Sequence, residues 1–394
     1  MSDTDASWLT SLVQPQLPFR EIFLNQWAES IEAIDCNSDQ LAARLRSKTS
    51  AAGGGLLLLS GKHCDALPQI AADFASQVRG TWLLAAGVGV LCGPQEWEGS
   101  AAAVGLCLKQ APRVLLGDRA DESFGRGIQA DWETHGPANT LVLIRGDQAE
   151  DGWQTFLSAT KEPIDNLFGG GSLPGVQLAR VSAGVVEFGP AAALFFGGSP
   201  FLRIRSSAAA RLLTPLLSAG QVRAGRLGTL DGMPALDRLR EATAQLGERA
   251  LVLLAVGAQD GALEKGARRI CLQPIVGVDP AAGSLVTTGQ LREGMRLALA
   301  VRDADASQAD LSEQLRSLRR ESRGTTPDFA LFLSCAGRGQ SLYGQEHVDA
   351  RLIRSHFPGL PLIGIHSTFE LAPLDGELRT CVYSGVLALF SRPS

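Results

Sequence analysis

The sequence predicts an α/β protein of two pseudo-repeated halves, in which mixed sheets pack together with flanking helices as a layered α/β sandwich. Two observations predict this class. Apolar runs that do not alternate with polar residues, such as 56–59 and 329–333, are typical of strands covered on both faces. In addition, an order of strand, helix, glycine-bearing strand, turn and strand recurs three times, although the copies are unevenly spaced.

The three copies divide most of the chain into elements. The first copy predicts strands at 56–59, 82–90 and 101–108, with a helix at 68–79. The second predicts strands at 141–144, 168–171, 184–188 and 191–196, with a helix at 153–160. The third predicts strands at 329–333, 360–365 and 381–390, with a helix at 345–357 that Pro358-Gly359 ends.

The segment between the second and third copies predicts further strands at 251–256, 274–278, 285–287 and 295–301. Pro234 suits the first turn of a helix that runs to about 246. A second helix has Ser307 as its expected N-cap and Gly324 at its end.

Asp231-Gly232 is a tight-turn signal. The predicted organisation is an N-terminal extension at 1–34, an N-terminal half at 35–231 and a C-terminal half at 232–394. The extension is rich in aromatic and aliphatic residues, which we expect to pack on the body. A short helix is expected at 39–46, with Ser38 as its N-cap.

Composition excludes several classes of protein. The chain has 394 residues, of which 45% are apolar, and a net charge of −5, which argues against a protein built to coat nucleic acid. Seven cysteines are scattered without metal-ligand spacing, and we find neither a signal peptide nor an apolar run long enough to span a bilayer. We therefore expect a cytoplasmic protein with no nucleic-acid or membrane partner.

The best candidate site follows the strand at 329–333. Arg338 stands there between two glycines, Gly337 and Gly339, while His366 and Glu370 follow the next predicted strand. Open α/β sheets usually bind ligands at such strand ends. Arg338 has two interpretations: it binds the anionic group of a ligand, or it pairs with Glu370 or Asp349 and braces the strand ends.

Catalysis and metal binding find less support. Cys335 could be a nucleophile with His366 as base and Glu370 as orienting group, but a small buried residue at a strand end is the favoured interpretation. His366 is interpreted as a structural imidazole. No histidine pair has the spacing of metal ligands, so we predict no catalytic residue, no metal site and no cofactor, haem included.

Several motifs together resemble a known family. They are Cys335-Ala336-Gly337-Arg338-Gly339, Tyr343-Gly344, Pro361-Leu362-Ile363-Gly364, Glu370-Leu371-Ala372-Pro373 and Leu230-Asp231-Gly232-Met233-Pro234. The sequence is similar, from about residue 35 to the end, to FIST proteins, the F-box and intracellular signal transduction sensory family. The motif that begins at Leu230 resembles the junction between the N- and C-terminal halves of that family, which implies the boundary between 231 and 232. It departs from the family at Ala336, where asparagine is usual, and at 367–369, where glycines are expected.

The resemblance implies a non-enzymatic, intracellular sensory protein that binds a small anionic or amino-acid-like ligand and has a possible signalling partner. The ligand-binding residues that it implies are Cys335, Gly337, Arg338, Gly339, Tyr343, His366 and Glu370. Two alternatives stay open. One is a cysteine-dependent small-molecule enzyme that uses Cys335, His366 and Glu370, and the other is an interaction scaffold derived from this family whose pocket is degenerate.

Overall fold

The fold is taken from a computed structural model of the chain. It describes residues 28–34, 53–148, 156, 164–197, 201–247, 250–257, 270–288, 291–374 and 376–393, with the backbone alone at 28–34 and 393. The expected helices at 39–46 and 153–160 lie outside these residues, apart from Phe156, as does the extension up to residue 27. Residues 28–34 of the expected extension form a strand of the body.

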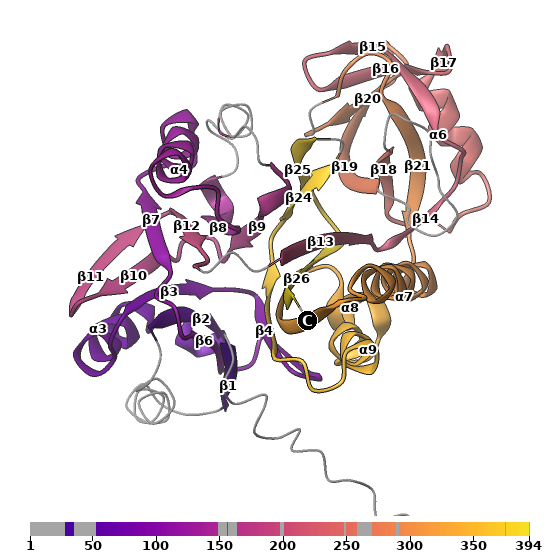
Figure 1. Cartoon of the computed structure of the whole chain (residues 1–394). Helices are drawn as coiled ribbons and strands as arrows, with labels where there is room; N and C mark the ends of the chain where they lie inside the picture. Colours follow the sequence, from indigo (N-terminus) through magenta and orange to yellow (C-terminus); the bar gives the residue numbers. More distant parts are fainter. Residues whose placement is uncertain are drawn as a thin grey trace, which may run out of the picture.

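Three six-stranded sheets make up most of the described chain (Figure 1). The first has the order β1 (Ala28–Ile34), β6 (Ala102–Leu108), β2 (Gly54–Ser60), β3 (Thr81–Ala86), β10 (Leu178–Ser182), β11 (Val185–Gly189). The second has the order β25 (Glu377–Cys381), β24 (Glu370–Leu374), β9 (Leu167–Ser172), β8 (Thr140–Arg145), β12 (Ala191–Phe195), β7 (Arg113–Gly117). The third has the order β13 (Phe201–Ala208), β26 (Ser384–Pro393), β22 (Thr325–Cys335), β23 (Leu362–Ser367), β4 (Gly89–Cys92), β5 (Gln95–Glu98).

The three sheets are copies of one design. Each has one parallel pair at its centre, namely β2–β3, β8–β9 and β22–β23, and its other pairings are antiparallel. In every copy the strand that closes the repeat, β6, β12 or β26, pairs with the first strand of the parallel pair. The predicted α/β class with mixed sheets and the threefold recurrence are therefore confirmed. The helix-flanked sandwich is wrong, because the described chain is rich in strands and contains a closed barrel.

Hairpins are exchanged cyclically among the three repeats. The hairpin β4–β5 follows β3 along the chain but pairs with β23 of the third sheet. In the same way β10–β11 follows β9 and pairs with β3, and β24–β25 follows β23 and pairs with β9. Each sheet is thus completed by a hairpin from another repeat, which ties the repeats into one body.

Three inner sheet faces meet in a shared apolar core. Its buried side chains come from all three parallel pairs and include Leu56, Leu143, Phe168, Leu333 and Ile365. The outer faces are covered by helices: α3 (Leu67–Gln77) on the first sheet, α4 (Glu122–His135) on the second, and α7 (Ala304–Glu321) and α9 (Val348–His356) on the third. Because both faces are covered, the strands read as continuous apolar runs.

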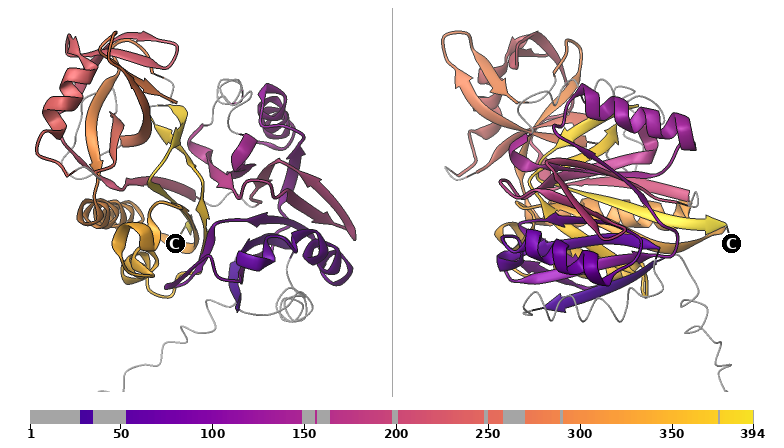
Figure 2. Two further views of the ribbon diagram at one scale, coloured as in Figure 1. Left: turned by 180° about the vertical axis from the view of Figure 1, so that it is seen from behind. Right: turned by 90° about the vertical axis from the view of Figure 1, so that its left-hand side faces the viewer.

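A closed six-stranded barrel is inserted between β13 and β22 of the third repeat. Its strands, in order, are β15 (Leu217–Arg223), β16 (Arg226–Leu230), β20 (Ser284–Thr287), β19 (Ile270–Asp279), β18 (Val252–Gly257) and β21 (Arg296–Arg302), and β21 pairs with both β18 and β15. β14 (Ala210–Leu212), β17 (Met233–Pro234) and α6 (Ala235–Thr243) attach to it. Figure 2 shows the barrel projecting beyond the three sheets. The sequence predicted strands in this segment but not their closure.

The barrel leaves and rejoins the body at one place, because the amide of Asp303 donates to the carbonyl of Ala209 at 3.2 Å. The predicted junction at 231/232 lies in the turn between β16 and β17, inside the inserted segment. The remaining described helices are α8 (Gly339–Tyr343) and the 3₁₀ turns η1 (Gly61–His63), η2 (Gly146–Gln148) and η3 (Ile164–Asn166). Within the described residues, no helix is both long enough and apolar enough to cross a membrane.

Three local predictions need correction. The expected strand at 82–90 is two strands in different sheets, because the amide of Gly87 bonds to Leu59 of the first sheet and that of Val88 to His366 of the third. The expected strand at 381–390 is likewise divided, at Tyr383, which has a positive φ of 51°. The helix that Ser307 was expected to cap begins earlier, because the side chain of Asp303 accepts from the amide of Ala306.

Candidate functional site

The predicted site residues lie where the parallel pair β22–β23 ends. The register of this pair places Cys335 and His366 on opposite faces of the sheet. Ser334 lies opposite His366, and Cys335 lies opposite Ser367. Since successive side chains of a strand point to opposite faces, Cys335 and His366 lie on different faces of the sheet. Cys335 belongs to the inner face and His366 to the outer face under α9.

The inner group consists of Cys335, Ser367 and Glu370. Glu370 is fully buried, and its carboxyl accepts from the hydroxyl of Ser367 at 2.8 Å and the amide of Ser384 at 3.2 Å. Burial raises the pKa of Glu370 well above its usual value. Burial, and then the neighbouring Glu370, raises the pKa of the Cys335 thiol to about 12. The thiol is therefore protonated at neutral pH and has no imidazole on its own side of the sheet, so this geometry gives the cysteine-enzyme alternative no support.

Arg338 has a different partner from Glu370. It is 0% exposed, and its Nε and Nη2 donate to the two carboxylate oxygens of Asp349 at 2.8 and 3.1 Å. Its Nη1 donates to the carbonyl of Ser207, and Nη2 also donates to the hydroxyl of Tyr343. Every nitrogen of the guanidinium thus donates within the protein. Although burial alone would lower the pKa of Arg338, Asp349 raises it, so the guanidinium keeps its charge. Arg338 therefore braces the strand ends, as the second interpretation expected, and its partner is Asp349.

The remaining predicted residues pack around this ion pair. Tyr343 donates its hydroxyl proton to Asp349, with 2.7 Å between oxygens, and lies 2.8 Å from the Ser307 hydroxyl. A side chain at Gly337 would overlap the ring of Tyr383, and one at Gly339 would lie 1.8 Å from a carboxylate oxygen of Glu98. A Cβ at either glycine would therefore force a neighbouring side chain to move.

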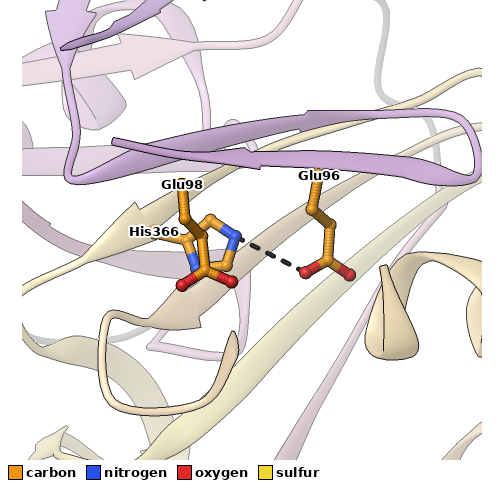
Figure 3. Close-up of side chains that lie close together, drawn as sticks. All are labelled: Glu96, Glu98 and His366. Atoms are coloured by element: carbon orange, nitrogen blue, oxygen red, sulfur yellow. Dashed lines mark ion pairs between the residues drawn. The ribbon is translucent and has the colours of Figure 1, made fainter. Parts of the chain in front are cut away.

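A second polar cluster, which the sequence did not predict, lies on the outer face. Figure 3 shows Glu96 and Glu98 on one strand facing His366. One ligand-type atom of each lies within 4.8 Å of the others, and Glu96 Oε2 is 3.7 Å from His366 Nε2. Burial, and then Asp349, raises the pKa of Glu96 to about 7, while burial lowers the pKa of His366.

This cluster was missed because β4–β5 is one of the exchanged hairpins, and its contact with β23 joins segments far apart in the sequence. One signal was present. Glu96 and Glu98 flank Trp97 in strict alternation, which places both acids on the same face of a strand. Trp97 packs against the shared inner core, so Glu96 and Glu98 lie on the opposite, outer face, next to α9.

The structure also contains a cavity of about 260 Å³ at the junction of the barrel with two sheets. It is lined by residues of β13, β19, β24, β25 and α7, together with Asp165 of η3. None of the predicted ligand-binding residues lines it. Arg203 and Arg205 lie on its β13 side, and Ala372 and Pro373 on its β24 side.

Two of the residues that line this cavity carry donors without a partner. Among the described residues, Arg203 Nη1 and the Ser206 hydroxyl are buried and have no hydrogen-bond partner. Arg203 Nη2 donates to the carbonyl of Glu321, and Arg205 pairs with the Glu321 carboxylate. Asp165 is exposed and adds an acid to the same lining.

The fold and these sites define a strand-rich α/β protein of three repeats with an inserted barrel. Residues 235–373 match the model of the FIST C domain. The match begins close to the predicted start of the C-terminal half at 232, and it confirms the family resemblance over these residues. It includes Arg338, Asp349 and His366, and it ends within β24.

Relatives in mycobacteria show similarity over part of the chain. Uncharacterized protein Mb0898c of Mycobacterium bovis and uncharacterized protein MT0656 of Mycobacterium tuberculosis are each 28% identical to it over 167 residues. The alignment covers 41% of this chain and 43% of each relative, so the chain spans less than half the length of the relatives it matches.

Proposed function

We propose that the protein is a non-enzymatic sensory protein, which binds a small anionic or amino-acid-like ligand in the cavity between β13, β19 and β24. The observation that carries the proposal is the lining of this cavity, which has two arginines on one strand and a buried donor, Arg203 Nη1, without a partner. A guanidinium suits a carboxylate, which it binds with two parallel hydrogen bonds. The volume approaches the size class of small-ligand sites.

Asp165 favours an amino acid over a simple acid. It supplies a carboxylate on the lining opposite in charge to Arg203 and Arg205, and so offers a partner for an ammonium group. The cavity joins strands from the barrel, the second sheet and the third sheet, so a ligand there would contact all three. Such a ligand could favour one arrangement of the barrel and the two sheets over another. A signalling partner would then recognise the arrangement that the ligand favours.

The earlier expectation placed the ligand on Arg338 and Glu370. Both side chains are 0% exposed and hydrogen-bonded within the protein, and the cavity offers donors that are not. We therefore propose the cavity as the ligand site and keep the Arg338 site as the alternative to be tested. The six cysteines of the described residues are free of disulfides, which supports a reducing, cytoplasmic setting as part of the proposal.

A thermal-shift screen with free amino acids and short mono- and dicarboxylic acids tests the proposal, followed by calorimetric titration of any compound that stabilises the protein. We expect Arg203→Met to weaken binding by one to two decades, since a charge-assisted hydrogen bond contributes about 1.5–3 kcal/mol. Asp165→Asn should weaken amino acids but not dicarboxylic acids. Arg211→Met is the matched control, because Arg211 is an exposed arginine that does not line the cavity.

Two results would contradict the proposal. One is equal affinity in the parent, Arg203→Met and Arg211→Met proteins. The other is a screen without any shift, combined with native mass spectrometry that finds no small molecule retained by the purified protein.

A further inference from the structure

We propose that Glu96, Glu98 and His366 form a binding site for one divalent transition-metal cation, on the outer face of the third sheet. The site is separate from the cavity, since none of the three residues lines that cavity. The proposal therefore does not depend on the function proposed above.

Strand register brings the three side chains together. His366 of β23 lies opposite Gly89 of β4, and Gly89 lies opposite Glu98 of β5. Glu96 lies two residues before Glu98 on the same face. Because Gly89 has no side chain, the space between His366 and Glu98 is open, and a Cβ at Gly89 would lie only 3.0 Å from His366 Cδ2.

The backbone orients both carboxylates toward the histidine. Glu96 Oε1 accepts from the amide of Ala350 at 2.7 Å, and Glu98 Oε1 accepts from the amide of Gln340 at 2.8 Å. One oxygen of each carboxylate is thus held by a backbone amide, which leaves the second oxygen available to a ligand. Glu96 Oε2 is the oxygen that lies near His366. Glu98 is half-buried, so the site is reached from solvent on its side.

His366 itself indicates a ligand. It is 1% exposed, and within the described residues neither ring nitrogen has a hydrogen-bond partner. The 3.7 Å between Glu96 Oε2 and His366 Nε2 is too long for a hydrogen bond. A buried imidazole without a partner is costly, and so are two adjacent carboxylates. One cation bound by all three would give one imidazole nitrogen a partner and offset the charge of both carboxylates.

The charged groups on the outer face of the third sheet also favour a bound cation. Glu96, Glu98 and Asp349 are three acids, and Arg338, which also acts on Glu96 and His366, is paired with Asp349. A divalent ion would offset the remaining negative charge. Imidazole with carboxylate oxygens suits Zn²⁺, Fe²⁺ or Mn²⁺, whereas Mg²⁺ and Ca²⁺ prefer oxygen ligands alone. The ligand atoms lie within 4.8 Å of one another. Ligand atoms bind Zn²⁺ at about 2 Å, so a bound ion would draw these three side chains closer together.

Equilibrium dialysis of the full-length, chelator-stripped protein against ZnCl₂, MnCl₂ or MgCl₂, with metal measured by mass spectrometry, tests the site. We expect about one Zn²⁺ or Mn²⁺ per chain, and Mg²⁺ to bind much more weakly. Glu98→Gln should weaken Zn²⁺ binding at least tenfold. Gly339→Ala should do the same without altering a ligand, because its new methyl group would lie 1.8 Å from Glu98 Oε1 and displace the carboxylate.

Glu98 and Gly339 are chosen because buried Glu96 and His366 also support the fold. Circular dichroism establishes that each variant is folded. Glu313→Gln, at a half-buried helix position, and His135→Gln, at an exposed one, are matched controls, and both should bind Zn²⁺ like the parent. Zn²⁺ binding that persists unchanged in folded Glu98→Gln, or that is lost in His135→Gln, would overturn the proposal. So would a parent protein that binds none of the three metals.

Discussion

At the residue scale, the ion pair between Arg338 and Asp349 is the strongest polar feature of the site. Both side chains are essentially buried, and two hydrogen bonds join them. Removing one partner leaves the other charge buried without compensation, which costs about 3–5 kcal/mol. We therefore expect Arg338→Met and Asp349→Asn each to lose that much free energy of unfolding in urea titrations.

The double variant Arg338→Met with Asp349→Leu should recover part of this loss, because no unpaired charge is left. Arg211→Met removes a partly exposed pair with Asp303 and should cost about 1 kcal/mol or less. Additive losses in the double variant, or a small loss in Arg338→Met, would show that the pair does not brace the strand ends.

Glu370 makes the stability depend on pH. Burial raises its pKa in the folded state, so the folded protein keeps this proton after the unfolded chain, with a pKa of about 4.3, has lost it. Its contribution to stability is therefore greatest below the unfolded pKa and falls as pH rises toward the folded pKa, by up to about 1.4 kcal/mol per pH unit.

Glu370→Gln removes this dependence and keeps the hydrogen bonds, because an amide can accept from the Ser384 amide and donate to the Ser367 hydroxyl. We expect the free energy of unfolding of the variant, relative to the parent, to rise from mildly acidic to mildly alkaline pH. Urea unfolding across that range measures it. A difference that is constant or that falls with pH would mean that the carboxyl is ionised when folded.

At the element scale, the parallel pairs depend on close backbone contact. A Cβ at Gly364 of β23 would lie 2.0 Å from the carbonyl oxygen of Phe332 in β22. The same contact occurs in the second repeat, where a Cβ at Gly169 would lie 1.9 Å from the carbonyl oxygen of Val142. Both glycines are the third residue of the second strand of their pair, so the repeats share a residue as well as a topology.

Gly364→Ala should therefore destabilise the protein by about 3 kcal/mol or more, because backbone cannot move away as a side chain can. Gly277→Ala in β19 is the control, since its Cβ would meet only Val286 at 3.8 Å, and it should change stability by no more than about 1 kcal/mol. Thermal unfolding of both compares them. Equal stability of the two variants would contradict the register of β22 and β23.

Element type could be predicted from the sequence, but sheet membership could not. The runs at 56–59, 141–144 and 329–333 are buried strands as expected, because an unbroken apolar run indicates cover on both faces. The run at 82–90 contains the point at which the chain changes sheets. Apolar pattern and glycine content are alike on both sides of that point, so nothing local shows that β3 and β4 pair with different repeats.

For the site, the sequence likewise predicted individual residues but not which of them face one another. Arg338 and its possible partner Asp349 were identified because a cation between two glycines at a strand end needs an anion nearby. Cys335 and His366 are close in the fold, but whether they face each other depends on a one-residue register that spacing does not reveal. Glu96 and Glu98 reach His366 only through the exchanged hairpin, and the cavity forms only where the barrel meets the sheets.

At the scale of the whole molecule, the exchanged hairpins make the three repeats inseparable, while the barrel is an insertion. Cutting the chain at 231/232 would divide the barrel and separate β13 from β26. We expect fragments 1–231 and 232–394, expressed separately, to lack cooperative unfolding. Replacing 210–302 by a short glycine-serine linker should leave a folded three-sheet body, because Ala209 and Asp303 are hydrogen-bonded neighbours. Two stable fragments, or an unfolded deletion protein, would contradict this architecture.

We have proposed that a small ligand binds where the barrel meets two sheets. Hydrogen–deuterium exchange of the full-length protein, with and without the best stabilising compound of the amino-acid and organic-acid screen, tests it most directly. We predict slower exchange at 202–206 of β13, 270–271 of β19 and 372–374 of β24 together, because these segments line the cavity from three parts of the fold. Protection confined to 335–349, around Arg338, would contradict the claim and locate the ligand at the strand ends instead.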